Sequence, residues 1–212
     1  LRPILHRPNL TVMTNTHVQK LALETNEHGP RATGVWITKG GDAPSLVTAM
    51  REVILAAGAV ASPQILQLSG IGEAGLMQQL GAAPVIDLPG VGHNLQDHLQ
   101  IRTIYKVSNT TTLNPRVNSL VGKAMMGLEY LLFKTGPLTM PPSQLGAFAK
   151  SDEAQPTPNM EWHVQPLSLD QFGSPLHSFN AITPSVCNLR PASRGAITAQ
   201  SLDPLIAPKI NL

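Results

Sequence analysis

The first hundred residues contain short runs of apolar side chains whose spacing predicts β-strands. Runs of this kind lie at residues 10–13, 18–23 and 32–37. The segment 27–30 (Glu-His-Gly-Pro) is a turn signal between the second and third runs, so these two are predicted to form a hairpin. A further short strand is predicted at residues 46–49.

An apolar run at residues 52–57 leads into Gly58 and is typical of a strand buried on both faces. Ser62 and Pro63 then predict a helix start, because a serine hydroxyl can accept a hydrogen bond from a free backbone N–H and proline suits the first helical position. The helix is predicted to end at Gly70. A strand, a glycine turn and a helix N-terminus together form a common binding site for phosphate-bearing cofactors.

The pattern changes in the second half of the chain. Residues 100–107 alternate as a strand does, and residues 117–133 have the spacing of a helix that packs against a sheet. Prolines then separate several β-type runs, which favours an antiparallel sheet. These runs lie at residues 144–150, 160–164, 179–186 and 196–201. The sequence therefore predicts an α/β or α+β protein with a mixed α/β domain at residues 1–102 and a mainly antiparallel domain at residues 103–212.

Composition narrows the classes of function. The formal net charge is +2 without a cluster of Lys and Arg, which argues against a nucleic-acid partner. No apolar run approaches the ~20 residues that a membrane-spanning helix needs. Charged residues make up only 13% of the chain and hydrophobic residues 42%, as expected of a piece that packs against further segments. We expect a cytoplasmic location and leave the oligomeric state open.

Candidate metal ligands and acid–base groups are few. None of the seven histidines has the His-x-x-x-His or Glu-x-x-His spacing, and a single cysteine excludes an internal disulfide and a Cys-based zinc site, so no metal site is predicted. Cys187 is interpreted as a small buried hydrophobe in a strand. His93 and His98 lie around Asp97 and could form an Asp–His couple for proton transfer. The favoured interpretation is that these side chains stabilise the loop by hydrogen bonds.

Two other patterns are interpreted as structural. Residues 70–75 (Gly-Ile-Gly-Glu-Ala-Gly) match the dinucleotide-binding fingerprint formally, but a helix rather than a strand is predicted before them, so they are interpreted as a helix end and a turn. Ser62 could serve a Ser-His-Asp hydrolase on residue type alone, but it lacks the Gly-x-Ser-x-Gly elbow that exposes such a nucleophile.

Two longer motifs carry a family resemblance. Residues 58–72 (Gly-Ala-Val-Ala-Ser-Pro-Gln-Ile-Leu-Gln-Leu-Ser-Gly-Ile-Gly) resemble the second signature of the glucose–methanol–choline (GMC) flavoenzymes. Residues 89–98 (Pro-Gly-Val-Gly-His-Asn-Leu-Gln-Asp-His) resemble the next block of that family. The likeness extends to residues 7–12, Val18, residues 189–195 and residues 201–204, and within the family it is strongest to choline-dehydrogenase-like alcohol dehydrogenases.

The resemblance implies a fold and a cofactor. It implies part of an FAD-binding, Rossmann-like domain followed by part of an antiparallel-sheet substrate domain. Val18 would offer its backbone to the adenine end of FAD, and Ala57 and Gly58 would pass beneath the ADP part. The family's Gly-x-Gly-x-x-Gly turn and its catalytic His segment have no counterpart here, so we expect a central fragment with no catalytic residue of its own.

The implied activity is that of an FAD-dependent oxidoreductase. It would act on the CH–OH group of choline or another primary alcohol, a small-molecule partner, and pass hydride to the flavin. Trp162, His163 and Phe148 could line the substrate cavity as an aromatic wall. The fragment alone is expected to bind FAD weakly or not at all and to be inactive. A hydroxynitrile-lyase-like enzyme on the same scaffold, a non-catalytic interaction domain and a hydrolase are the alternatives.

Overall fold

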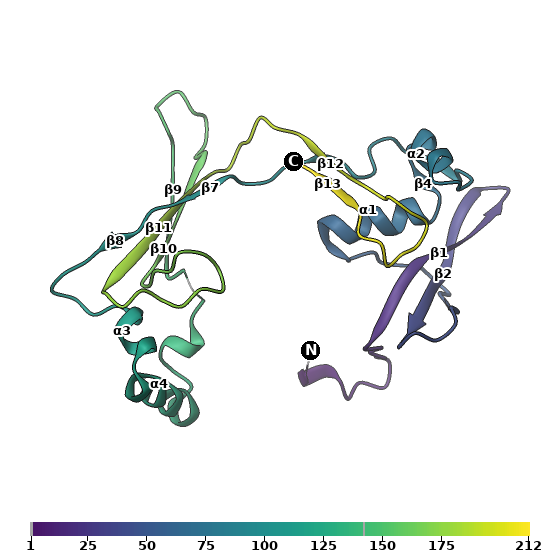
Figure 1. The fold of residues 1–212 in the computed structure, drawn as a ribbon. Helices are drawn as coiled ribbons and strands as arrows, with labels where there is room; N and C mark the ends of the chain where they lie inside the picture. Colours follow the sequence, from purple (N-terminus) through teal and green to yellow (C-terminus); the bar gives the residue numbers. More distant parts are fainter. Residues whose placement is uncertain (1, 142) are drawn as a thin grey trace. The chain divides into compact units, whose positions relative to one another are not determined.

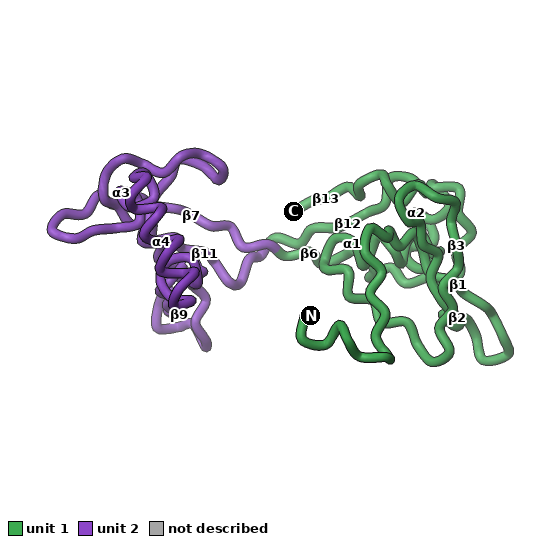
Figure 2. The backbone as a smooth tube through the Cα atoms, turned by 90° about the horizontal axis from the view of Figure 1, so that it is seen from below, with its two compact units in different colours: residues 1–96, 193–212 green, residues 97–192 purple. Residues whose placement is uncertain are grey.

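The computed structural model describes residues 2–141 and 143–212 of the chain and divides it into two compact units. Unit 1 comprises residues 1–96 and 193–212, and unit 2 comprises residues 97–192 (Figure 2). The two units differ from the predicted division into residues 1–102 and 103–212, because the C-terminal residues belong to unit 1. Residues 193–212 are joined to unit 1 by hydrogen bonds, described below, that no local sequence pattern reveals.

Unit 1 contains a three-stranded antiparallel sheet in the order β1-β2-β3 (Figure 1). The strands are β1 (Thr16–Asn26), β2 (Gly29–Lys39) and β3 (Ser45–Thr48). The hairpin and the third strand predicted from the sequence are thus confirmed. The predicted strand at residues 10–13 is wrong: the segment is irregular and lies after the 3-10 helix η1 (Arg2–Ile4).

Two helices and two short strands follow in unit 1. They are α1 (Gly58–Leu68), β4 (Ile71–Gly72), α2 (Ala74–Gln79) and β5 (Ile86–Asp87), and β4 pairs with β5 in parallel. Helix α1 begins four residues before the predicted start, because a positive φ of 83° at Gly58 lets the chain turn directly into the helix. Pro63 consequently lies inside the helix. The helix ends as predicted, with Gly70 at a φ of 80°.

The predicted buried strand at residues 52–57 is wrong. These residues belong to none of the strands in the described part of the chain, and Ile54 is 80% exposed. A strand needs a hydrogen-bonded neighbour, and no described segment pairs with residues 52–57. The apolar run indicates a tendency to be buried, but it does not specify a strand with which residues 52–57 could pair.

The C-terminal residues close unit 1 through a second small sheet. It has the order β13-β12-β6, formed by β6 (His93–Leu95), β12 (Gly195–Thr198) and β13 (Lys209–Asn211). Gln67 of α1 is fully buried and fixes this sheet to the helix. Its Nε2 donates to the backbone oxygens of Val91 (3.3 Å) and Ile197 (3.0 Å), and its Oε1 accepts from the N–H of Ala199 (2.7 Å).

Unit 2 is built around an antiparallel sheet in the order β7-β11-β10-β9, as the alternating sequence predicts. Strand β8 pairs with another part of β11. Along β11 the buried positions alternate with half-buried ones up to Cys187, which is 4% exposed. The strands are β7 (Gln100–Arg102), β8 (Tyr105–Lys106), β9 (Leu145–Ala149), β10 (Met160–Gln165) and β11 (Ala181–Asn188).

The helical segment of unit 2 differs from its prediction. Instead of one helix over residues 117–133 there are two, α3 (Leu113–Asn118) and α4 (Leu120–Phe133), followed by the 3-10 helix η2 (Pro137–Thr139). Ser119 separates them, and its hydroxyl accepts from the N–H of Gly122 (3.3 Å) as the N-cap of α4. Helix α4 packs mainly on α3 and η2 rather than on the sheet (Figure 1). None of the described helices is long and apolar enough to cross a membrane.

Candidate functional site

The sequence-predicted cofactor residues Ala57 and Gly58 lie together at the N-terminus of α1. Both are exposed, and Ala57 is the residue that precedes the helix. A Cβ added to Gly58 would meet no atom within 4 Å, so glycine is needed here for its positive φ and not for close packing. The Ser62 hydroxyl accepts a hydrogen bond from the N–H of Ala57 (3.1 Å), which holds the turn closed.

The third predicted cofactor residue, Val18, lies on β1, a strand that packs against α1. It is half-buried and opposite Ile37, and the register shifts between Val18 and Lys20. Such an irregularity interrupts the ladder and is frequent beside binding sites. The N–H of Leu21 donates to the Ser69 hydroxyl at the far end of α1 (2.8 Å). No hydrogen bond among the described residues joins Val18 directly to the Ala57 turn.

The two family-like motifs meet in space within unit 1. A cavity of about 410 Å³ lies between α1 and the loop at residues 91–96. Gly92 makes this approach possible: a Cβ there would lie 2.2 Å from the Ile197 oxygen and 2.7 Å from Gln67 Nε2. The cavity is lined by Ala59, Ser62, Pro63, Leu66, Val91, Gly92, His93, Asn94, Leu95, Gln96 and Ile197.

The histidines around Asp97 belong to different units. His93 lies in unit 1, where its Nε2 is 3.6 Å from Glu73 Oε2, whereas His98 lies in unit 2. No ion pair or hydrogen bond among the described residues connects Asp97 to either histidine. The geometry therefore gives no support to an Asp–His couple in this loop.

The predicted aromatic wall is wrong as a single surface. Successive side chains of a strand point to opposite faces, so Trp162 and His163 on β10 face away from each other. In the register of the sheet, Phe148 is opposite Glu161, which places it on the His163 face. Trp162 is opposite Ala147 and lies on the other face.

A Ser-His-Asp arrangement that sequence reasoning missed lies in the loops of unit 2. His177 Nδ1 is 2.9 Å from Ser168 Oγ, and its Nε2 is 3.1 Å from Asp170 Oδ1. Ser168 is fully buried and also receives a hydrogen bond from Asn114 Nδ2 (3.1 Å). A substrate cannot reach that hydroxyl, so the arrangement stabilises the loops and is not a hydrolase site.

Comparison with known proteins supports the family resemblance. The model of the GMC oxidoreductase family, in its N-terminal part, matches residues 1–100. Nearly half of the chain is thus similar to the N-terminal part of GMC oxidoreductases. This match confirms the resemblance of the motifs at residues 58–72 and 89–98.

Named GMC-type relatives extend the likeness over nearly the whole chain. An oxygen-dependent choline dehydrogenase of Stenotrophomonas maltophilia is 38% identical over 205 residues, which is 96% of this chain and 35% of the relative. The corresponding protein of Brucella ovis is 37% identical over 210 residues, 99% of this chain and 37% of the relative. The chain thus spans little more than a third of the length of these curated relatives.

Solved structures share the fold. A formate oxidase variant of Aspergillus oryzae RIB40 has a TM-score of 0.85 at 24% identity and covers 99% of this chain, which corresponds to 41% of that protein. Pyridoxine 4-oxidase of Mesorbium loti has a TM-score of 0.72 at 24% identity and covers 100% of this chain and 36% of that protein. The expected fold class, mixed α/β structure with an antiparallel sheet, is confirmed.

Proposed function

We propose that this chain is part of an FAD-dependent oxidoreductase that acts on the CH–OH group of a small alcohol. The observation that carries the proposal is the 38% identity to an oxygen-dependent choline dehydrogenase over 96% of the chain. An alcohol oxidation of this kind needs a hydride acceptor, which FAD supplies when bound. Choline or another primary alcohol is the proposed substrate, and the cytoplasm is the proposed location.

Unit 1 is the proposed cofactor part, with Ala57, Gly58 and Val18 as FAD contacts. The first N–H groups of an α-helix have no partner within the helix, so the α1 N-terminus suits a phosphate-bearing ligand. The turn at Gly58 is exposed and no described side chain covers it, which leaves the backbone accessible. Unit 2 is the proposed substrate part. No residue of the chain is assigned a catalytic role.

Flavin content and reduction test the proposal. The protein that contains this chain, purified whole, should carry the absorption spectrum of oxidised flavin and lose it on anaerobic addition of choline or a simple alcohol. A protein without flavin would refute the cofactor assignment. Bound flavin that no alcohol reduces would instead favour a lyase on the same scaffold. The 212-residue chain alone should be colourless and inactive.

A matched pair of variants tests the cofactor contact at Gly58. Gly58→Val should lower the flavin content, because a branched side chain at a φ of 83° distorts the turn and blocks approach to the α1 N-terminus. Gly81→Val has a similar φ of 77° and equally open surroundings, but it lies at the end of α2. It should cost similar stability and leave the flavin content unchanged. Equal flavin loss in both variants would contradict the assignment.

A further inference from the structure

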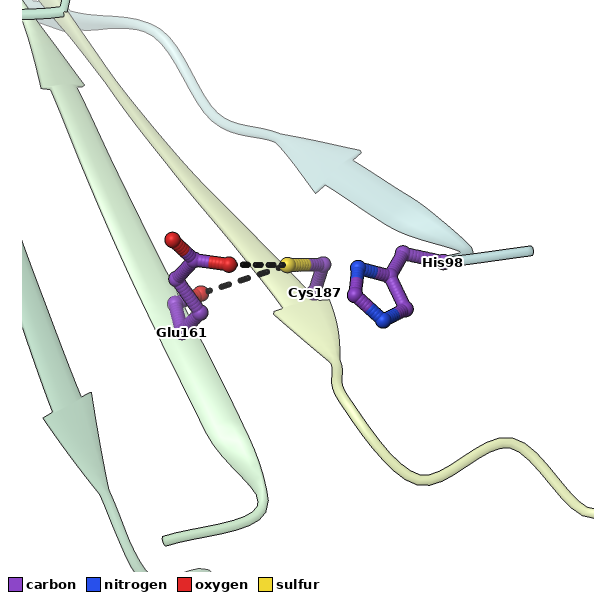
Figure 3. A group of neighbouring side chains, drawn as sticks. All are labelled: His98, Glu161 and Cys187. Atoms are coloured by element: carbon purple, nitrogen blue, oxygen red, sulfur yellow. Dashed lines mark hydrogen bonds between the residues drawn. The ribbon is translucent and has the colours of Figure 1, made fainter. Parts of the chain in front are cut away.

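Three segments of unit 2 that are distant in sequence bring together an imidazole, a carboxylate and a thiol. Figure 3 shows Glu161 on β10 and Cys187 on β11, with the ring of His98 on the other side of the sulfur. Glu161 and Cys187 are direct partners in the sheet register. Gln100 of β7 is opposite Cys187, and His98 lies two residues before Gln100 in the segment that leads into β7. Their ligand atoms all lie within 4.8 Å of one another.

We propose that His98, Glu161 and Cys187 form a binding site for a zinc-type divalent transition metal. This site is independent of the proposed FAD contacts, which lie in unit 1. Neither the sequence pattern nor the likeness to choline dehydrogenases indicates it.

The spacing of two of the ligand atoms already suits zinc. Cys187 Sγ lies 3.7 Å from Glu161 Oε2. With Zn–S near 2.3 Å and Zn–O near 2.1 Å, two ligands of a tetrahedral site lie about 3.6 Å apart. The His98 nitrogen lies within 4.8 Å of both other ligand atoms, so the imidazole has to approach by at most about 1.4 Å to complete the geometry. His98 can do so because its side chain is exposed and it precedes β7 rather than lying within the ladder.

A fourth residue orients the carboxylate. His163, two residues after Glu161 on the same face of β10, places its Nε2 3.2 Å from Glu161 Oε1. This contact holds one carboxylate oxygen and leaves the other, Oε2, directed at the sulfur. Metal-binding carboxylates are commonly hydrogen-bonded in this way by residues that do not touch the metal. His163 is therefore a positioning residue in the proposed site.

The charges of the three ligands balance a divalent ion. In the structure the Cys187 thiol donates a hydrogen bond to the Glu161 carboxylate. Metal binding breaks the S–H bond, forms the S–metal bond and releases one proton to solvent. Thiolate and carboxylate then neutralise the two positive charges, and the imidazole is neutral. Water would complete a tetrahedral shell. A thiolate ligand favours zinc over Mg²⁺ or Ca²⁺.

Competition for Zn²⁺ against a chromophoric chelator tests the site on the full chain. We expect one Zn²⁺ per chain, bound at least ten-fold more weakly by His98→Asn and at least 100-fold more weakly by Cys187→Ala. His93→Asn is the matched control, because His93 also lies beside a glutamate (3.6 Å) but has no thiol nearby. It should bind Zn²⁺ as the unchanged chain does. Circular dichroism checks that each variant folds, and His98, being exposed, can be replaced without disturbing the core.

Co²⁺ provides a readout that only the proposed ligands can produce. The Co²⁺-loaded chain should show a near-ultraviolet thiolate-to-cobalt charge-transfer band that Cys187→Ser abolishes. Absence of the band, or unchanged Zn²⁺ affinity in folded His98→Asn and Cys187→Ala, would overturn the proposal. Equal weakening in His93→Asn would overturn it as well.

Discussion

Replacing Gln67 by leucine should destabilise unit 1 severely. The Gln67 side chain is fully buried and is the only link that joins α1 by hydrogen bonds to both the residue-91 loop and β12 within the described part of the chain. Leucine has a similar size but leaves the oxygens of Val91 and Ile197 and the N–H of Ala199 without their partner. Each buried unpaired group costs about 1–3 kcal/mol.

The expected net loss of stability is smaller than the sum of these three costs. Leucine adds apolar burial worth about 1–2 kcal/mol, and the surroundings relax in part. We expect the free energy of unfolding of unit 1 to fall by about 3–5 kcal/mol. Because whole domains are stable by only about 5–15 kcal/mol, this loss would bring unit 1 close to unfolding.

The two tryptophans allow the units to be followed separately. Trp36 lies in β2 of unit 1, and Trp162 lies in β10 of unit 2. In a Trp162→Phe background, tryptophan fluorescence during urea denaturation therefore reports unit 1 alone. This separation matters because a single unfolding free energy is not defined for two independent units.

Gln64 provides the matched control on the same helix. Its Nε2 donates to the Ile206 oxygen (2.8 Å), and this hydrogen bond is exposed to solvent. Gln64→Leu should cost less than about 1 kcal/mol, since water can replace the lost partner. Equal shifts for the two leucine variants, or a shift below about 1 kcal/mol for Gln67→Leu, would refute the reasoning.

Three further predictions concern other positions. In urea denaturation, Gly92→Ala should lower the free energy of unfolding by several kcal/mol more than Gly81→Ala. Both glycines have a positive φ, but only at Gly92 would the new Cβ collide with backbone. Equal losses of stability would contradict this. Asn114→Ala should lower the free energy of unfolding of unit 2 by about 2–4 kcal/mol, because Asn114 is fully buried and its amide makes four hydrogen bonds. Trp162 fluorescence in a Trp36→Phe background measures this loss, and exposed Asn118→Ala should cost under about 1 kcal/mol. Burial raises the pKa of the Cys187 thiol, so its alkylation should become fast only at a higher pH than for a free thiol. Because the folded state keeps the thiol proton to a higher pH than the unfolded state does, unit 2 should lose stability as pH rises above about 8.5. An alkylation profile like that of a free thiol would contradict this.

The sequence predicts those parts of the fold whose signals are local. The hairpin of β1 and β2 follows from two alternating runs and a turn between them, and the end of α1 follows from a glycine with a positive φ. The segment at residues 52–57 shows the limit of such signals. Its apolar pattern indicates burial but carries no information about the strand that would bury it.

Pairing between distant segments could not be predicted for the same reason. The contact of β12 with β6 joins residues about a hundred positions apart, and nothing in either strand specifies the other. The cluster of His98, Glu161 and Cys187 escaped the sequence analysis because ligand-spacing rules apply within one helix or loop. Here the sheet register, not the sequence spacing, brings the three side chains together.

The return of residues 193–212 to unit 1 has a consequence for the order of events on the ribosome. Unit 2 is encoded as an insertion, so its whole sequence is synthesised before the last strands of unit 1. At about 5–20 residues per second, the α1 region waits roughly 6–25 s for β12 to be synthesised, with the amide of Gln67 still solvated. A nascent chain of this protein therefore exposes an incomplete unit 1 throughout the synthesis of unit 2, and it is during this interval that chaperones have most to protect.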